Sequence, residues 1–293
     1  MTKTVLALGM FDGMHIGHKK LIDTAVLLAA KYGHEPAVFT FANHPQKLFG
    51  AKVARLCSNE ERLAIMQKLG AKRIEQVEFT RELSSLSPEK FMDMLIEKMQ
   101  PHTLVAGFNY TFGKNKSGNT DLLTKLAIKN GIGAAVIPPV NFANKPVSST
   151  RIRELIEKGD VQNAQLMLGR TYALSGTVMQ NKRIGSTIGF PTANILPDET
   201  RAIPQDGVYI SMARLAGDML PSVTNIGTNP TVGGRSRMIE THIFDFNRDI
   251  YGEAIEVFFV KRLRGVKAFS SLDELKAQIA SDCKTAKEYF GCN

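Results

Sequence analysis

The first half of the chain alternates short apolar runs with segments of helical periodicity, and this alternation is the strongest constraint on its fold. A helix is predicted over residues 16–32, with Gly33 as its C-terminal stop, and capping patterns at Ser58 and Ser87 predict two more helix starts. The predicted strands are residues 5–8, 37–41, 103–107 and 134–138. We therefore expect an α/β fold, with a mostly parallel sheet that binds ligands at the carboxyl ends of its strands.

The pattern changes at about residue 172, where short alternating segments separated by turns replace the helices. This predicts an antiparallel sheet or barrel. The segments are residues 172–178, 207–214, 222–226, 240–246 and 256–260, and a final helix is predicted from Ser271 towards Tyr289. Between the halves, residues 149–158 are predicted to form a helix that ends at Gly159, followed by a short helical stretch. We predict two domains, residues 1–165 and 166–293.

Composition limits the function classes without choosing one. No apolar run in the 293 residues reaches the roughly 18 needed for a membrane helix, and the first residues lack a signal-peptide pattern. The three cysteines form no C-x-x-C motif. We therefore expect a cytoplasmic protein that acts without a membrane. The formal net charge of +9 attracts polyanions, which include both nucleic acids and nucleotide phosphates.

The stretch GMFDGMHIGH, residues 9–18, lies between the first predicted strand and helix. A helix N-terminus binds phosphate through unpaired backbone N–H groups, and glycines let backbone and phosphate approach closely. His15 and His18 can donate hydrogen bonds to phosphate oxygens, which suits a departing pyrophosphate. An ordinary glycine-rich turn with incidental histidines is the alternative interpretation.

A second polar segment, residues 148–153, follows the last predicted strand of the first half and reads SSTRIR. Serine and threonine can cap a helix and also hydrogen-bond a nucleotide, while arginine binds phosphate through a planar fork. Alternatively, Ser148 is an ordinary N-cap and the arginines are solvated.

Together the two segments resemble the nucleotidylyltransferase superfamily. The order G-x-F-D-G-x-H-x-G-H, T-F-x-x-H-P, G-F-N-Y-x-F-G and S-S-T is similar to the adenylyltransferase half of bacterial FAD synthetases, across nearly all of residues 1–165. The resemblance implies a Rossmann-like domain that transfers AMP from ATP to FMN, releasing FAD and pyrophosphate. Because the FMN phosphate is already an anion at pH 7, this reaction needs alignment and charge stabilisation and no general base.

The resemblance also implies residue roles. His15, His18 and Arg153 would be catalytic. The implied ATP-binding residues are Gly9, Phe11, Asp12, Gly17, Ser148, Ser149 and Thr150, and the implied flavin-binding residues are His44, Asn109 and Tyr110. Asn109 stands where the family has Asp and Asn43 where it has Pro, so the chain departs from the family pattern at the expected flavin contacts.

The second half contains GFPTAN at residues 189–194 and E-T-H at residues 240–242. With neighbouring segments these resemble riboflavin kinase, a six-stranded antiparallel β-barrel with a terminal helix. The resemblance implies that Gly189, Pro191, Thr192 and Asn194 bind ATP, with Thr192 and Asn194 on Mg²⁺. It implies that Glu240 is the catalytic base, since the riboflavin hydroxyl is a neutral alcohol.

The loop before GFPTAN departs from the family pattern. Asn181 and Arg183 replace glycines, and Ser186 replaces an arginine that would bind phosphate. FMN adenylyltransferase activity alone, beside an impaired kinase domain, is therefore an open alternative.

Two further alternatives are another nucleotidylyltransferase and a nucleic-acid-binding protein. The riboflavin-kinase-like segments of the second half argue against another nucleotidylyltransferase, because such an enzyme needs no domain of this kind. The low aromatic content of 8% and the absence of Trp speak against the second, since single strands bind by stacking. We expect ATP, FMN and riboflavin as partners and Mg²⁺ as cofactor, with no nucleic acid; the oligomeric state is left open.

Overall fold

The computed structural model describes residues 2–180, 188–231 and 234–292, which form two compact units, Met1–Ser149 and Thr150–Asn293. The division after Ser149 assigns the helices α6 (Ser149–Glu157) and α7 (Val161–Leu168) mostly to the second unit. The predicted boundary at residue 165, drawn between two functional domains, remains a prediction.

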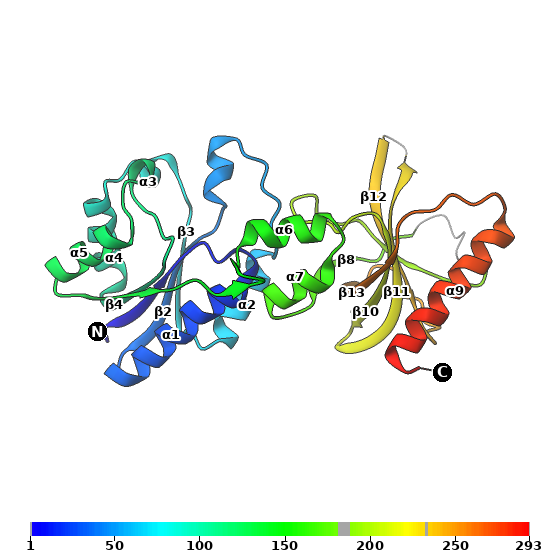
Figure 1. Ribbon diagram of the computed structural model, residues 1–293, viewed down its shortest axis with the longest axis horizontal. Coiled ribbons are helices and arrows are strands. Elements are labelled where there is room, and N and C mark those ends of the chain that lie inside the picture. The colour runs from blue at the N-terminus through cyan, green and yellow to red at the C-terminus, as the bar shows by residue number, and fades with distance from the viewer. Residues whose placement is uncertain (1, 181–187, 232–233, 293) are drawn as a thin grey trace. The chain divides into compact units, whose positions relative to one another are not determined.

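The first unit contains a five-stranded parallel sheet of order β3-β2-β1-β4-β5 (Figure 1). Its strands are β1 (Thr4–Leu8), β2 (Glu35–Phe41), β3 (Arg73–Val77), β4 (Pro101–Gly107) and β5 (Gly133–Ile137). Its helices are α1 (Ile16–Tyr32), α2 (Asn59–Lys68), α3 (Arg81–Ser84), α4 (Pro88–Met99) and α5 (Thr120–Lys129), with short 3-10 turns η1 (Asp12–Met14), η2 (Pro45–Phe49) and η3 (Lys114–Lys116). The predicted parallel α/β fold is confirmed.

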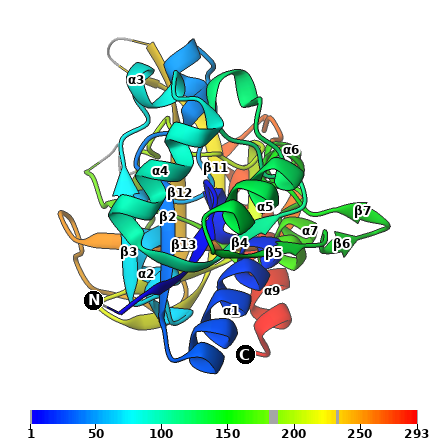
Figure 2. The same cartoon turned by 90° about the vertical axis from the view of Figure 1, so that its left-hand side faces the viewer.

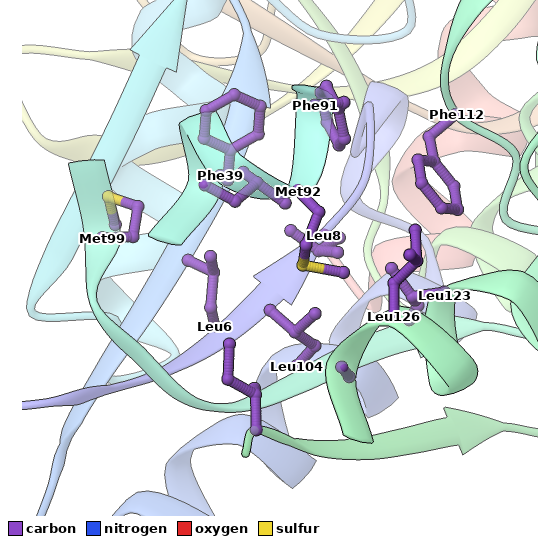
Figure 3. Packing of buried hydrophobic residues seen from close by; sticks show 14 of the residues in the cluster. Leu6, Leu8, Phe39, Phe91, Met92, Met99, Leu104, Phe112, Leu123 and Leu126 are labelled. Carbon is purple, nitrogen blue, oxygen red and sulfur yellow. The ribbon is translucent and has the colours of Figure 1, made fainter. Parts of the chain in front are cut away.

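Strand β1 lies in the middle of this sheet and is buried on both faces. Leu6 and Leu8 pack towards α4 and α5, in the cluster drawn in Figure 3. Val5 and Ala7 point to the other face and pack with residues of α1 and α2. Because successive strand residues point to opposite faces, a fully apolar strand such as β1 needs helices on both sides.

Strand β3 was missed by the sequence analysis. It is an edge strand that pairs only with β2 among the described strands, and it carries Arg73 and Glu75. Edge strands commonly carry charges that discourage further pairing, so β3 lacks the apolar run by which the other strands were predicted. A small hairpin of β6 (Asn141–Phe142) and β7 (Lys145–Pro146) extends away from the sheet (Figure 2).

The second unit contains a six-stranded antiparallel sheet of order β8-β13-β10-β11-β12-β9. Its strands are β8 (Tyr172–Thr177), β9 (Ala193–Ile195), β10 (Gly207–Leu215), β11 (Asp218–Thr231), β12 (Gly234–Ile243) and β13 (Ala254–Arg264). Met179, two residues after β8, forms an isolated bridge with Asn194 of β9, and its N–H donates to the Asn194 carbonyl at 2.8 Å. The expected six-stranded antiparallel architecture is confirmed.

Helix α9 (Leu272–Phe290) packs on one face of these strands. As predicted, Ser271 caps it by accepting the N–H of Glu274. Its Asp282 accepts from Arg264 of β13 at 2.8 Å, while its Cys283 and Ala286 pack on apolar residues of β10 and β11. The helix therefore covers the sheet face that carries Arg264.

Candidate active sites

The loop between β1 and α1 has an unusual backbone. Phe11 and Met14 have φ values of 55° and 45°, in the left-handed region that few non-glycine residues adopt. Gly13 has a φ of 76°, and a Cβ there would meet Leu56 at 2.6 Å. Backbone strain of this kind persists only where the surrounding structure holds the residue in place, and it is often found at functional sites.

Asp12 is one of the groups that maintain this loop. Its side chain is 5% exposed, and its Oδ1 accepts the N–H of Leu56 at 3.1 Å. Its backbone carbonyl accepts the hydroxyl of Ser149 at 2.9 Å. Asp12 therefore has a structural role, and its expected contact with ATP remains a prediction. Gly9 contributes space, because a Cβ there would lie 3.2 Å from the ring of Phe11.

His15 is the N-cap of α1, and this explains the spacing of His-x-Gly-His. Its Nδ1 accepts the backbone N–H of His18 at 3.2 Å. A neutral His15 must therefore carry its proton on Nε2, which makes that atom a hydrogen-bond donor. A Cβ on Gly17 would lie 3.1 Å from Cε1 and 3.2 Å from Nδ1 of His15, a tight contact that would displace the ring from its place over the first turn.

The His18 ring stacks on His15, with 3.6 Å between ring centroids and 14° between ring planes. Phe11 contacts the same ring edge-on at 5.3 Å. Burial, and then the nearby charges of His15 and Arg62, hold the pKa of His18 well below its usual value. Within the described ranges no group hydrogen-bonds His18 Nδ1, although this atom is buried. The site thus holds a neutral histidine with unused hydrogen-bonding capacity beside a helix N-terminus.

Arg62 of α2 was not identified from the sequence, yet it holds this site together. Its side chain is 3% exposed and donates to the carbonyls of Met10 at 2.8 Å and Phe41 at 2.6 Å. Met10 directly follows the loop's first glycine and Phe41 ends β2, so one guanidinium fixes the carboxyl ends of two neighbouring strands. Burial lowers the pKa of Arg62. Arginine in a polar helix usually lies at the surface, so periodicity gave no signal for its burial.

The predicted ATP-binding segment at the start of α6 reaches the loop through Ser149, by its bond to the Asp12 carbonyl. Ser148 directly precedes the helix. Thr150 and Arg153 belong to the second compact unit, where Arg153 Nη1 donates to Thr150 Oγ1 at 3.4 Å. Their place against the two histidines remains a prediction.

The expected flavin-binding residues follow the carboxyl ends of β2 and β4, the two neighbours of β1. His44 is the N-cap of η2 and accepts the N–H of Gln46 at 3.2 Å. Asn109 is exposed beyond β4, while burial raises the pKa of Tyr110. Asn43, noted above as a departure, exchanges two hydrogen bonds with the backbone of Phe79 at 3.1 and 2.7 Å, which fixes the loop after β2.

In the second unit the segment from Gly189 to Asn194 leads into β9. Gly189 has a φ of 91°. Asn194 is 6% exposed, and its Nδ2 donates to the carbonyl and hydroxyl of Thr192 at 3.0 and 3.3 Å. Its Oδ1 is buried and has no hydrogen-bond partner among the described residues. An orphaned amide oxygen beside a hydroxyl is a donor set that suits Mg²⁺. Asn181, Arg183 and Ser186 lie outside the described residues.

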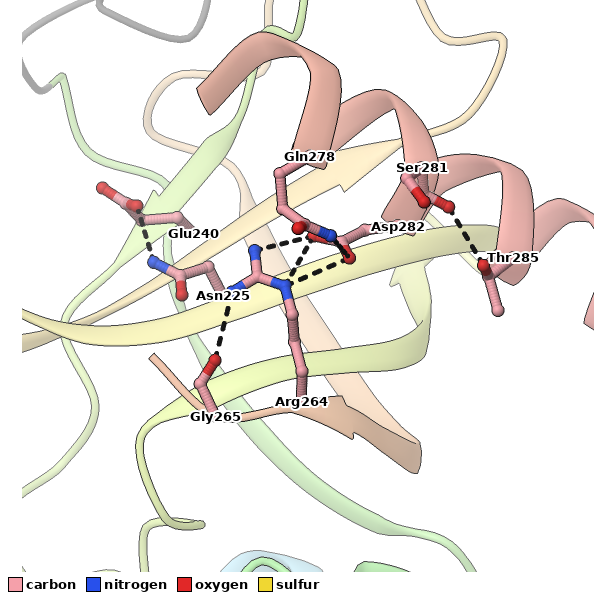
Figure 4. Close-up of polar contacts among 8 residues, drawn as sticks. All are labelled: Asn225, Glu240, Arg264, Gly265, Gln278, Ser281, Asp282 and Thr285. Carbon is pink, nitrogen blue, oxygen red and sulfur yellow. Dashed lines mark hydrogen bonds and ion pairs between the residues drawn. The ribbon is translucent and has the colours of Figure 1, made fainter. Parts of the chain in front are cut away.

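Glu240 lies between two asparagines in one row across three strands. Asn194 of β9 and Asn225 of β11 are its direct partners in the antiparallel pairing, so all three side chains share a face. Asn225 Nδ2 donates to Glu240 Oε2 at 3.2 Å, as Figure 4 shows. The expected base therefore has a neutral donor on one side and the expected metal ligand on the other. The sequence could have paired Asn225 with Glu240 only if the register had been known.

Comparison with known proteins gives matches over both units. The FAD synthetase family model matches residues 1–151, and the riboflavin kinase family model matches residues 168–290. Proteins named bifunctional riboflavin kinase/FMN adenylyltransferase from Bacillus subtilis (strain 168) and Escherichia coli (strain K12) are each 35% identical, over 98% of this chain and 93% of theirs.

A similar fold is found in a crystal structure described as a macrolide-efflux protein from Streptococcus pneumoniae. It aligns with a TM-score of 0.90 and 32% identity, covering 98% of this chain and 94% of that one. In the part of our chain that the structure describes, no helix has the length and apolar character needed to cross a membrane.

Proposed function

The chain belongs to the bifunctional riboflavin kinase/FMN adenylyltransferase family, and on this premise we propose that it converts riboflavin to FMN and FMN to FAD, using ATP in both steps. The stacked pair His15–His18 at the N-terminus of α1 is the observation that carries the second step. The row Asn194–Glu240–Asn225 supports the first. Because ATP is the substrate of both steps, we also propose a cytoplasmic location.

In adenylyl transfer an oxygen of the FMN phosphate attacks the α-phosphorus of ATP, and pyrophosphate leaves. The first unit offers donors for the leaving group: backbone N–H groups at the N-terminus of α1 other than that of His18, Nε2–H of His15, and the ring of His18. A neutral His18 can gain a proton as negative charge collects on the pyrophosphate, and this would place a cation where charge develops. We further propose that Ser148, Ser149, Thr150 and Arg153 hold ATP, and that His44, Asn109 and Tyr110 lie along the flavin.

In phosphoryl transfer the riboflavin 5′-hydroxyl attacks the γ-phosphorus of ATP, the bond from this phosphorus to the β,γ-bridging oxygen breaks, and ADP leaves. Glu240 accepts the hydroxyl proton, and the Asn225 amide keeps the carboxylate oriented. Asn194 Oδ1 and Thr192 Oγ1 would hold Mg²⁺. When bound, the ion neutralises charge on the phosphates of ATP.

The test is chromatography of flavins after incubation with ATP and Mg²⁺, starting once from riboflavin and once from FMN. The wild-type chain is expected to give FAD from both. Glu240→Gln should abolish FMN formation from riboflavin and keep FAD formation from FMN. His18→Ala should have the opposite effect and let FMN accumulate.

The outcomes separate the candidate functions. If FAD formed only from FMN, the chain would have adenylyltransferase activity without riboflavin kinase activity. The altered loop at Asn181, Arg183 and Ser186 would then be the first place to look for the cause. FAD formation from neither flavin would contradict the proposal and direct attention to another acceptor of the adenylyl group. Loss of both activities in either variant would contradict the assignment of one activity to each unit.

A further inference from the structure

His242 lies two residues after Glu240 on β12, so both side chains project from the same face of the strand. Its Nδ1 is 2.8 Å from the carbonyl oxygen of Pro191. A carbonyl can only accept, so Nδ1 carries the proton and donates. The imidazole ring also packs edge-on against Phe190, at 5.5 Å between centroids, and against Phe244, at 5.8 Å.

This hydrogen bond continues a strand pairing that the backbone cannot continue. The ladder between β12 and β9 pairs Ile239 with Ile195, Glu240 with Asn194 and Thr241 with Ala193, where it ends. Pro191 lies two residues before Ala193, the last paired residue, and has no N–H to donate to a ladder. The side chain of His242 supplies a donor to its carbonyl. The residues just before β9 are thereby tied to the strand that carries Glu240.

We propose that His242 is a positioning residue for phosphoryl transfer, which fixes the segment 190–194 so that the oxygens of Thr192 and Asn194 face the phosphates of magnesium-bound ATP. The inference rests on the proposed kinase function. Gly189 at one end of the segment has a positive φ, and β9 at the other end has only three residues. The ladder pairs with β12 hold Ala193 and Asn194, and the bond from His242 adds a contact to Pro191 before them.

The experiment compares His242→Asn with His242→Ala in the full chain. The Asn amide Nδ2 takes nearly the position of His Nδ1 and keeps a donor, whereas Ala keeps none. Hydrogen–deuterium exchange of peptides covering residues 188–195 is measured without ligands, and KM for magnesium-bound ATP and kcat are measured with riboflavin.

For His242→Ala we expect faster exchange in this segment and a rise in KM of about ten-fold, the size of effect that one hydrogen bond contributes, with a smaller fall in kcat. His242→Asn should return exchange and KM to within about three-fold of wild type. FAD formation from FMN should be unchanged in both variants.

Unchanged exchange and unchanged KM in His242→Ala would overturn the inference. If His242→Asn behaved like His242→Ala, ring packing on Phe190 would be responsible, and the hydrogen-bond role would be wrong. If the wild-type chain did not phosphorylate riboflavin, the proposed kinase function would fail, while the exchange measurement would still decide whether His242 anchors the segment.

Discussion

At the scale of single residues, Gly17 matters through the side chain that it lacks. Its absent Cβ leaves room for the His15 ring, whose Nδ1 accepts the N–H of His18 and so leaves the proton on Nε2. Alanine is normally the better residue in a helix, by about 1 kcal/mol. At position 17 this preference for alanine is opposed by the His15 ring, which lies over the first turn of α1 and would contact the added Cβ.

We predict that Gly17→Ala lowers FMN adenylyl transfer at least about ten-fold with little loss of stability, because the added Cβ displaces the His15 ring at the helix N-terminus. Steady-state rates and a thermal melt would check this. Gly265→Ala is a matched control, since a Cβ there would lie 3.7 Å from its nearest neighbour, Arg262. Full activity in Gly17→Ala would contradict the role given to His15.

Because the pKa of His18 is lowered in the folded chain, we expect the free energy of unfolding to depend on pH. Unfolded His18 has the ordinary pKa of about 6.5, while folded His18 binds a proton only at lower pH. As pH falls below 6.5 the unfolded chain takes up this proton first, so folding loses up to about 1.4 kcal/mol per pH unit. Stability of the first unit should therefore fall between pH 7 and pH 5.5.

The measurement is the urea midpoint of the first unit at both pH values, monitored by hydrogen exchange in peptides of α1. His18→Gln should reduce the pH dependence, while the exposed control Lys20→Gln should keep it. An equal pH dependence in all three chains would show that another group titrates.

At the scale of elements, the antiparallel pairing of β9, β12 and β11 assembles the second site. Asn194, Glu240 and Asn225 are far apart in the sequence, and the register makes them direct neighbours. The same face continues through Val208 of β10 to Arg264 of β13, which binds Asp282 of α9 (Figure 4). A one-residue slip in register would turn these side chains to the opposite face.

We predict that Asn225→Asp shifts the acidic limb of the pH profile for riboflavin phosphorylation upward by about one unit, because a second carboxylate raises the pKa of the pair. Asn225→Ala should lower kcat without this shift. The profile of kcat/KM against pH would measure both effects. Asn247→Asp, an exposed change in the same unit, is the control. An unshifted profile in Asn225→Asp would mean that the amide does not act on the base.

At the scale of the whole molecule, each unit has its own hydrophobic core. The first has clusters on both faces of its parallel sheet, and the second has a cluster between its strands and α9. Leu104 is fully buried in the first unit (Figure 3). Truncation of such a residue costs about 2–5 kcal/mol.

We predict that Leu104→Ala weakens hydrogen-exchange protection throughout β1, β2 and β4 and leaves the protection of β10 and β13 unchanged. Riboflavin phosphorylation should persist at temperatures where FMN adenylyl transfer is lost. An equal loss of protection in both units would show that they unfold as one cooperative body.

The sequence by itself determined the local structure and the reaction chemistry. Glycine stops, capping serines and apolar periodicity act within a few residues, so α1, α9 and the central strands were predicted close to their observed bounds, as were the starts of α2 and α4. The histidine loop was identified for the same reason, because its function depends on a strand, a turn and a helix that follow one another directly.

Tertiary structure decided the partners of these residues. The burial of Arg62 between the ends of β1 and β2, the row through Asn225 and Glu240, and the bond from His242 to Pro191 join residues 15 to 52 positions apart. Such contacts depend on strand order and register, which nonlocal packing sets and no local pattern encodes. The edge strand β3 also depends on tertiary structure, because its charged segment is a strand through its pairing with β2.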